Sequence, residues 1–501
     1  MPPAVQAPAL SFDARARRDG NCGPPAFNHQ IPSDLARSAH LAVDKDLRAS
    51  IAVTRFGLGA RPGDIAAARA DPEGYLAAQI RPQGADRPAG TTATSGERIN
   101  EYVAYRKARA MEKRLGEGKT DDGKMANRAL RREAAGDFLA RVQLAARADA
   151  GFRERWTLFW ANHFTVSAKK LATVTLVGPF EEEAIRPRVF GRFEDLLVAS
   201  SSHPAMLTYL DQARSIGPGS LTARTKGGNG KHNGLNENLA REIMELHTVG
   251  VDAGYTQGDV TEFARAMTGW SFAGRTDPAD SPRGFLFREE THEPGARMIM
   301  GRRYAEGGQD QARAVMKDLA ASPRTAHHIA MKIARHFVAD DPPPSLVARL
   351  EQAFSRTGGR LDTVAESLIA SPEAWDPAAR KFKTPYEFMI SSWRATDVAP
   401  TDVQSITTVM TAMGQKPFSA PSPKGWPEEA QVWCAPDAVV KRMTWSEAFA
   451  TQVTGDRDPV QLAQVALGAR LTPLVARTIA RAETRQEGLS ILLMSPEFQR
   501  R

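Results

Sequence analysis

The chain has 501 residues, of which 42% are apolar and 25% are charged, and this composition is typical of a folded domain rather than of a disordered chain. No apolar run approaches the roughly 18 residues of a membrane helix, so the sequence predicts no membrane span. Two cysteines, Cys22 and Cys434, exclude a disulfide framework and a cysteine zinc module. The net charge of +8 permits an anionic partner without requiring one.

Residues 1–48 are rich in proline and glycine among scattered charges, and we expect an irregular N-terminal tail there. Arg15, Arg17 and Arg18 resemble part of a twin-arginine export signal, but no apolar segment follows them. The sequence therefore predicts no export directed by a signal of its own.

Beyond the tail, apolar residues recur at spacings of three and four, and alternating β-branched runs are scarce, which is typical of helices. Repeated Asp-Pro or Ser-Pro pairs mark helix starts, because the first residue caps the helix and proline fits its first position. We expect one small β-hairpin, in which 285–288 pairs with 297–300 around a turn at Pro294-Gly295. The predicted fold is all-α, with one large multi-helical domain over 49–501. Long loops rich in glycine and proline are expected at 81–95, 214–234 and 414–436.

Most of the net charge lies in one segment, because residues 98–132 carry a net charge of +6. The segment is predicted to form two helices with a break near 116–123. Only Tyr102 and Tyr105 could stack on a base, so nucleic-acid binding is not expected. A solvated helical hairpin and a docking surface for an acidic partner remain the two interpretations.

The first candidate for chemistry is a stretch of aromatic residues that contains a histidine. On a helix, Trp156, Trp160 and His163 fall on one side, so His163 is expected to be at least partly buried. A buried imidazole needs a hydrogen-bond partner or a metal ion. A core histidine, a metal ligand and a general base are therefore the open interpretations.

The densest group of polar residues lies at 236–248. On an unbroken helix, Glu242 and Glu245 share one face, while His247 lies beyond the apolar stripe. A metal site would then use Glu242 and Glu245 together with His163 or His292, and such ligands suit Fe, Mn or Zn. The alternative is an ordinary surface ladder of charges made by Glu237, Arg241 and Glu245.

Four further features have simpler interpretations. Asp211 follows a short helix whose C-terminal end disfavours an acid, which suggests a cationic partner. Thr256 and Asp259 resemble a capping box. His292 lies at the expected turn and is predicted to be exposed enough to reach a ligand. The helix face that carries His328, Lys332 and His336 is interpreted as interfacial or solvated.

Nine short segments share a resemblance to one family of proteins. They are residues 55–62, 160–164, 236–250, 255–257, 268–270, 292–301, 413–415, 421–426 and 495–498. These segments occur in the family's order and cover about residues 51–501. On this basis the chain is identified as a member of the uncharacterised bacterial family known as domain of unknown function eighteen-hundred.

The resemblance implies no settled activity. It does imply a partner, because members are often encoded beside secreted proteins that resemble the alkaline-phosphatase and sulfatase superfamily. Many members bear export signals, which this sequence lacks. A cytoplasmic protein, a truncated or mis-started sequence, and export to the periplasm with a signal-bearing partner are the three interpretations that remain.

Two functions therefore stay open from the sequence. The first is a metal-dependent enzyme whose carboxylate–histidine centre (Glu242, Glu245 and His163, with Asp211 or His292 adjoining) activates water or oxygen. The second is a non-catalytic helical partner or export escort of the phosphatase-like protein. No nucleotide cofactor is expected, because the glycine-rich loop at 214–234 lacks the spacing of a P-loop.

Overall fold

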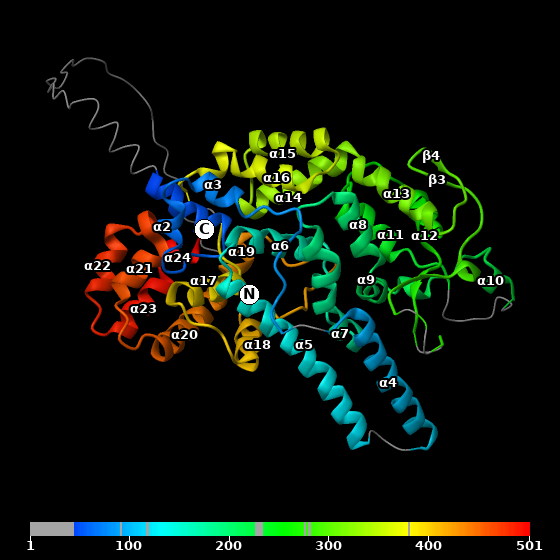
Figure 1. Cartoon of the computed structure of the whole chain (residues 1–501), viewed down its shortest axis with the longest axis horizontal. Helices are drawn as coiled ribbons and strands as arrows, with labels where there is room; N and C mark the ends of the chain where they lie inside the picture. Colours follow the sequence, from blue (N-terminus) through cyan, green and yellow to red (C-terminus); the bar gives the residue numbers. More distant parts are fainter. Residues whose placement is uncertain are drawn as a thin grey trace, which may run out of the picture. The chain divides into compact units, whose positions relative to one another are not determined.

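The computed structural model describes residues 45–90, 93–116, 120–225, 234–274, 277–278, 281, 283–378 and 381–501. The described residues belong to one compact unit and are mainly helical, with two small antiparallel strand pairs. The expected all-α fold is thus confirmed (Figure 1). Within this part of the chain, no helix combines the length and apolar character needed to cross a membrane.

Most of the predicted tail, residues 1–44, lies outside the described residues. Residues 45–51 are helical, so the prediction of irregular structure is wrong for 45–48. The first helices that follow are α2 (Asp64–Ala68), α3 (Pro72–Ala77), α4 (Ser95–Arg114), α5 (Asp121–Arg147), α6 (Gly151–His163) and α7 (Leu171–Phe180).

The middle of the chain is also mainly helical. Its α-helices are α8 (Phe193–Ser202), α9 (Pro204–Tyr209), α10 (Leu221–Thr225), α11 (Asn238–Glu242), α12 (Gln257–Met267), α13 (Gln309–Ala321), α14 (Pro323–Phe337), α15 (Pro344–Thr357) and α16 (Leu361–Ile369). The C-terminal α-helices are α17 (Pro385–Thr396), α18 (Val403–Ala412), α19 (Ala430–Trp433), α20 (Pro436–Val453), α21 (Pro459–Leu467), α22 (Pro473–Ala480), α23 (Arg485–Met494) and α24 (Pro496–Gln499).

Shorter elements of two kinds interrupt these helices. The π-helical segments are η1 (Ala52–Phe56), η2 (Glu181–Ile185) and η5 (Ile243–His247). The 3-10 turns are η3 (Arg186–Arg188), η4 (Gln212–Arg214), η6 (Glu289–Thr291), η7 (Pro372–Trp375) and η8 (Gly468–Arg470). Such π segments occur often at functional sites, and η5 replaces the second half of the helix that was expected to run unbroken through 236–248.

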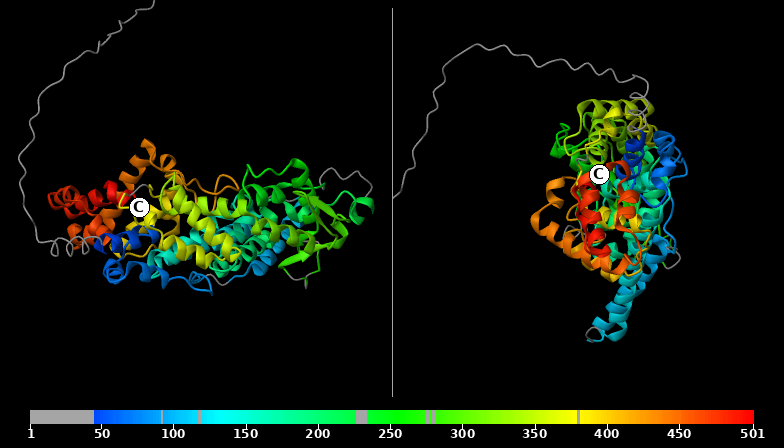
Figure 2. Two further views of the ribbon diagram at one scale, coloured as in Figure 1. Left: turned by 90° about the horizontal axis from the view of Figure 1, so that it is seen from above. Right: turned by 90° about the vertical axis from the view of Figure 1, so that its left-hand side faces the viewer.

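Two apolar cores hold the helices together. The first is centred on aromatic residues of α6 and its neighbours, including Trp156, Trp160 and Phe337. The second gathers α17, α20, α21 and α23 with part of α5. Figures 1 and 2 show these C-terminal helices side by side at one end of the described unit. Phe418 packs against both cores, so the loop that carries it joins the two.

Helix caps follow the sequence closely. The side chains of Asp71, Ser322 and Ser495 cap α3, α14 and α24 as expected. Ser371 makes no side-chain cap bond to the 3-10 turn that follows it. Thr256 and Asp259 form the predicted capping box at the start of α12.

The strands pair differently from the prediction. β1 (Trp270–Phe272) pairs with β2 (Phe285–Phe287), and β3 (Arg297–Ile299) pairs with β4 (Arg302–Tyr304). The expected pairing of 285–288 with 297–300 is therefore wrong. The reason is the turn at Met300 and Gly301, which both adopt positive φ. Two such residues form the tight turn that folds a strand back onto the segment directly after it.

Candidate functional site

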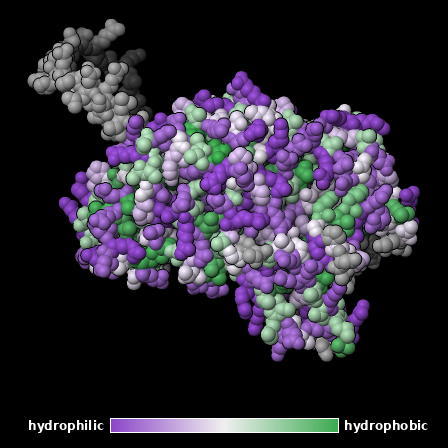
Figure 3. Space-filling view, viewed as in Figure 1, coloured by the Kyte–Doolittle hydropathy of each residue, from purple (hydrophilic) through white to green (hydrophobic). Residues whose placement is uncertain are grey.

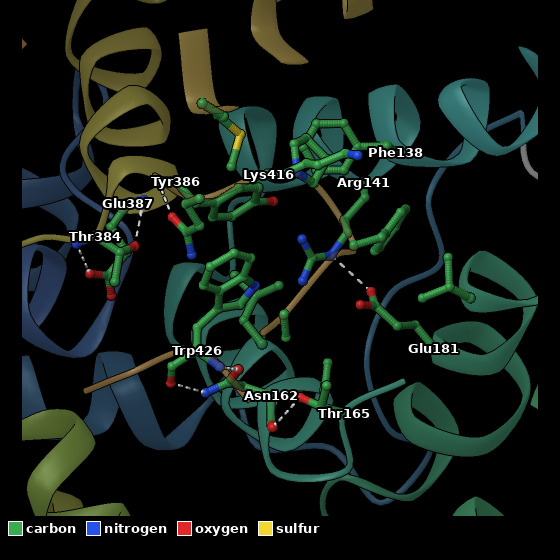
Figure 4. Close-up of a pocket in the computed structure, with 18 of the residues that line it drawn as sticks. Phe138, Arg141, Asn162, Thr165, Glu181, Thr384, Tyr386, Glu387, Lys416 and Trp426 are labelled. Atoms are coloured by element: carbon green, nitrogen blue, oxygen red, sulfur yellow. Dashed lines mark hydrogen bonds and ion pairs between the residues drawn. The ribbon is translucent and has the colours of Figure 1, made fainter. Parts of the chain in front are cut away.

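A pocket with a volume of about 110 Å³ lies where the two apolar cores meet. Val177 and Phe180 belong to the first core, whereas Leu58 and Tyr386 belong to the second, and all four line it. We call it the central pocket. Figure 4 shows Thr384 and Glu387 on one side, Arg141 and Glu181 on the other, and Asn162 and Trp426 below.

The loop between α18 and α19 forms one wall of the central pocket, and Asn162 clamps it. Asn162 Nδ2 donates to the Trp426 carbonyl at 3.1 Å, and the Trp426 amide donates to Asn162 Oδ1 at 2.7 Å. Gly425 adopts a φ of +89°, and a Cβ there would lie 2.5 Å from the Asn162 carbonyl oxygen. Glycine is therefore required at this close approach. Figure 4 shows the clamp.

His336, near the end of α14, lines the central pocket. Its Nδ1 lies 2.9 and 3.0 Å from the two carboxylate oxygens of Glu428. Its Nε2 is buried and has no hydrogen-bond partner among the described residues, and the residue as a whole is 8% exposed. A carboxylate at Nδ1 accepts a proton-bearing N–H, so Nε2 is assigned as the unprotonated nitrogen.

Charge and burial act in opposite directions on this pair. Burial lowers the pKa of His336, and the carboxylate of Glu428 opposes that shift without cancelling it. For Glu428, burial raises the pKa, but His336 and Lys381 outweigh it and hold the pKa at about 2. At neutral pH the pair therefore consists of a neutral imidazole and an ionised carboxylate.

Further contacts fix the position of Glu428. Its backbone carbonyl accepts a hydrogen bond from Lys381 Nζ, and Lys381 also pairs with Asp340. Asp340 in turn accepts the backbone N–H of Ala430 at 2.8 Å. The carboxylate that orients His336 is thus held between α14 and the segment before α17.

Glu387 is a second buried carboxylate in the central pocket. It pairs with Arg155 of α6 and, at 3.1 Å, with Arg501. Burial raises the pKa of Glu387, but the two guanidinium groups outweigh it and hold the pKa well below its usual range. Arg501 also donates to the His336 carbonyl at 2.6 Å. The network therefore ties together α6, α14 and α17.

Arg141 and Tyr386 supply polar atoms on the opposite side of the central pocket. The Arg141 guanidinium lies 4.9 Å from the ring centre of Tyr386 and 5.4 Å from that of Phe418. Its Nε lies 2.8 Å from Glu181 Oε2. The Tyr386 hydroxyl is buried and has no partner among the described residues. It is therefore available to donate a hydrogen bond to a ligand.

A second group of buried and half-buried bases lies beside the first core, and we call it the histidine cluster. It consists of His163, His247 and His328 with Lys332. His163 Nε2 lies 3.2 Å from the His247 carbonyl oxygen, and both ring nitrogens of His247 lack partners in the described structure. Burial lowers the pKa of His247 to about 3, that of His328 to about 4 and that of Lys332 to about 8.

The two glutamates of the predicted metal site lie apart from this cluster. Arg241 binds Glu237 at 3.0 Å and Glu245 at 3.5 Å, which confirms the surface ladder of charges. Glu242 is half-buried, and burial together with Glu245 raises its pKa. Its charge also contributes to the high pKa of Tyr209.

The two other predicted site residues have structural partners. Asp211 forms an ion pair with Lys170 at 2.7 Å, which confirms the expected cationic partner, and it adopts a left-handed backbone with φ +59°. His292 is 7% exposed, so the prediction that it is exposed is wrong. Its Nδ1 lies 2.8 Å from the Thr268 carbonyl oxygen, because η6 turns the ring inward against Phe287.

The structure does not bring the predicted metal ligands into one group. Among the described residues, no three His, Cys, Asp or Glu side chains are grouped so that they could hold a metal ion. His163 contacts His247, whereas Glu242 and Glu245 lie on α11 and η5 beside Arg241. These positions do not fit the predicted Fe, Mn or Zn centre.

Sequence reasoning missed His336 and Glu428 as site residues. His336 was interpreted as interfacial or solvated, but it is buried and bound to a carboxylate. Glu428 lies 92 positions further along the chain in a segment interpreted only as a loop. No local spacing links the two residues, and the prolines of the loop, including Pro427 beside Glu428, were the local hint of a fixed backbone.

A family model described as "Protein of unknown function (DUF1800)" matches residues 51–500, which confirms the resemblance inferred from the sequence. No curated protein and no solved structure matches the chain.

Proposed function

The chain belongs to the family described as protein of unknown function (DUF1800). From the geometry of the central pocket, we propose that it is an enzyme in which His336 activates water for hydrolysis. The observation that carries the proposal is the difference in hydrogen bonding between the two ring nitrogens of His336. Nδ1 is bound to Glu428, Nε2 is buried and has no partner among the described residues, and His336 is one of the residues that line the central pocket.

This arrangement suits a general base. Because the imidazole is neutral, Nε2 can take a proton from a water molecule in the pocket as that water attacks the substrate. The ionised Glu428 then stabilises the imidazolium that forms and keeps the ring in one orientation. The same Nε2–H can afterwards protonate the leaving group.

The pocket also offers groups for negative charge. Lys416 lines the pocket, is exposed, and forms no ion pair within the described part of the chain. The buried hydroxyl of Tyr386 can donate to an oxygen on which charge develops. We therefore assign a small anionic ester, or an ester that becomes anionic in the transition state, as the class of substrate.

The proposal keeps the water-activating enzyme expected from the sequence but uses other residues. Proton transfer is assigned to His336 rather than to Glu242, Glu245, Asp211 or His292. The alternative of a non-catalytic partner of a phosphatase-like protein rests on the family resemblance alone, and it stays a prediction.

A panel of chromogenic nitrophenyl esters of acetate, phosphate and sulfate tests the proposal. We expect turnover of at least one ester by the purified protein and a loss of about 10²–10⁴-fold in His336→Gln. The matched control is His327→Gln on the same helix, because His327 forms an exposed pair with Glu351 at 2.8 Å. Equal turnover by wild type and His336→Gln, or no turnover of any ester, would contradict the proposal.

A further inference from the structure

Helices α4 and α5 form an antiparallel hairpin whose base is firmly attached. Arg98 near the start of α4 pairs with Glu133 and, at 3.3 Å, with Asp137, both on α5. Ser95 donates to Glu183 at 2.7 Å through its amide and its hydroxyl. These contacts fix the open end of the hairpin to the rest of the described unit.

The two helices also hold each other along their length. Asn127 donates to the hydroxyl of Tyr105 at 3.3 Å. Closer to the closed end, Glu112 is buried and accepts hydrogen bonds from Arg109 and Thr120. Figure 1 and the right-hand view of Figure 2 show this closed end pointing away from the other helices. The hairpin is thus an internally braced projection.

The closed end carries large apolar side chains in contact with solvent. Met111, Leu115 and Met125 are 55%, 60% and 64% exposed, and we call these three residues the hairpin tip. Met111 and Leu115 share one face of α4 because they are four positions apart. Figure 3 shows hydrophobic colour on this projection among hydrophilic residues. An apolar cluster on a projecting end marks an interaction surface.

Positive charge surrounds the hairpin tip. The exposed cations of the two helices within residues 98–132 include Arg106, Lys107, Lys113, Arg114, Lys124, Arg128, Arg131 and Arg132. Among the described residues, the exposed acids near the closed end are Asp121, which pairs with Lys124 at 3.0 Å, and Asp122. Because residues 98–132 carry a net charge of +6, the surface is complementary to an anionic partner.

We propose that the hairpin tip docks onto the surface of an anionic lipid bilayer. Met111, Leu115 and Met125 enter the boundary between headgroups and acyl chains, and the lysines and arginines contact the acidic headgroups. A fluid bilayer can surround a convex apolar end from all sides. A folded protein partner would instead need a matching hollow, and the charge surrounds the apolar residues instead of forming one flat face. Exposed apolar and basic residues are interleaved near the closed end, as in Met111, Lys113 and Leu115, so both kinds of side chain can contact the same bilayer surface.

Vesicle flotation with the full chain tests the proposal. The probes are phosphatidylcholine vesicles with and without about 30% phosphatidylserine, at about 0.1 M and 0.5 M salt. We expect binding to the anionic vesicles that falls by at least about tenfold without phosphatidylserine and at the higher salt. The variant Met111→Ser/Leu115→Ser/Met125→Ser should lose about tenfold or more in binding to the anionic vesicles.

The chain offers a matched control. Val440, Met443 and Leu474 are 59%, 46% and 67% exposed on α20 and α22, away from the basic hairpin. Their replacement by serine removes a similar exposed apolar area and should leave vesicle binding unchanged. Circular dichroism verifies that both triple variants stay folded, which is expected because the replaced side chains are exposed.

Three outcomes would overturn the proposal. The first is no binding of wild type to anionic vesicles at the lower salt. The second is equal binding by the tip variant and wild type. The third is salt-sensitive binding to polyglutamate without binding to vesicles, which would identify an acidic protein as the partner of the hairpin.

Discussion

Helix α14 carries a buried histidine, His336, and a half-buried one, His328, and they differ in what surrounds them. His336 at one end binds the carboxylate of Glu428 and lines the central pocket. His328, two turns earlier, belongs to the histidine cluster, where ring nitrogens contact backbone carbonyls or have no partner. Burial lowers the pKa in both places, but only His336 has an ionised partner that opposes the shift.

The difference separates a base that can accept a proton from bases that are kept neutral. In the central pocket, an imidazolium would be stabilised by Glu428. In the histidine cluster, the positive charge of Lys332 disfavours protonation of His163 and His247. A lowered pKa alone therefore does not distinguish the two sites, and the proposal for His336 rests on its oriented ring and its unpartnered nitrogen as well.

The largest effect is expected from Glu428→Gln, which makes the surroundings of His336 resemble those of the histidine cluster. Without the carboxylate, the imidazolium loses its partner and the ring can adopt the other tautomer. We expect ester turnover to fall by about 10³–10⁴-fold. Because a negative charge is removed, the pKa of His336 falls further, so the acid limb of the rate profile should move to lower pH. An unchanged rate and profile would contradict the role of Glu428.

Glu387→Ala should produce the next largest effect, on stability. The variant leaves Arg155 and Arg501 buried without their shared carboxylate, and breaking such a buried pair costs about 3–5 kcal/mol. Urea unfolding measures this loss. Glu73→Ala is the control, because Glu73 pairs with Arg48 on the surface, where an ion pair contributes less than about 1 kcal/mol. Similar losses for both variants would show that the buried network is not special.

Acidification should lower stability through the histidine cluster, where His247 has no ionised partner. The ordinary pKa of a histidine side chain is 6.5, whereas burial lowers that of His247 in the folded protein to about 3. Below pH 6.5 the unfolded state therefore binds a proton that the folded state does not. Stability is complete above pH 6.5 and is lost as the pH falls toward 3. We expect His247 to account for about 2–3 kcal/mol between pH 7 and about pH 4.5.

The control for this pH dependence is His247→Leu, which has no titrating ring. Its free energy of unfolding should fall less steeply over the same interval, by about the amount assigned to His247. If wild type and His247→Leu show parallel pH dependence, His247 does not carry the effect.

The smallest effect is expected from Gly425→Ala, which disturbs the central pocket and leaves the histidine cluster untouched. Its Cβ would meet the Asn162 carbonyl at 2.5 Å, and the backbone there has a positive φ. We expect a loss of about 1–3 kcal/mol in stability. Turnover should fall while the acid dependence of unfolding stays that of wild type. Gly414→Ala is the control for the close contact alone, because Gly414 also has a positive φ of +91° but a Cβ there meets nothing within 4 Å; it should lose less stability than Gly425→Ala.

Much of the fold could be predicted because it depends on local signals. Helical periodicity, proline at helix starts and the capping box at Thr256 and Asp259 all act within a few residues. The strand pairing was wrong because the turn at Met300-Gly301 depends on positive φ at a methionine, which the sequence does not reveal. The change from α11 to η5 has no local signal either.

The central pocket could be predicted only in part. Asn162 lies in the aromatic stretch that was predicted to carry chemistry, but the predicted site residue there was the neighbouring His163. The pairing of His336 with Glu428, and of Glu387 with Arg501, joins segments that are far apart along the chain. Such contacts arise from the docking of the two apolar cores. They cannot be predicted from the composition or from the spacing of residues along the chain.

The position of the central pocket between two cores also affects how the chain unfolds. Its walls come from α6 and α7 on one side and from α17 and the Phe418 loop on the other. A ligand that binds there contacts both halves, so its binding energy also opposes their separation. Calorimetry of the liganded protein would then register one cooperative melting unit, and fragments divided between the cores would regain the site only on reassociation.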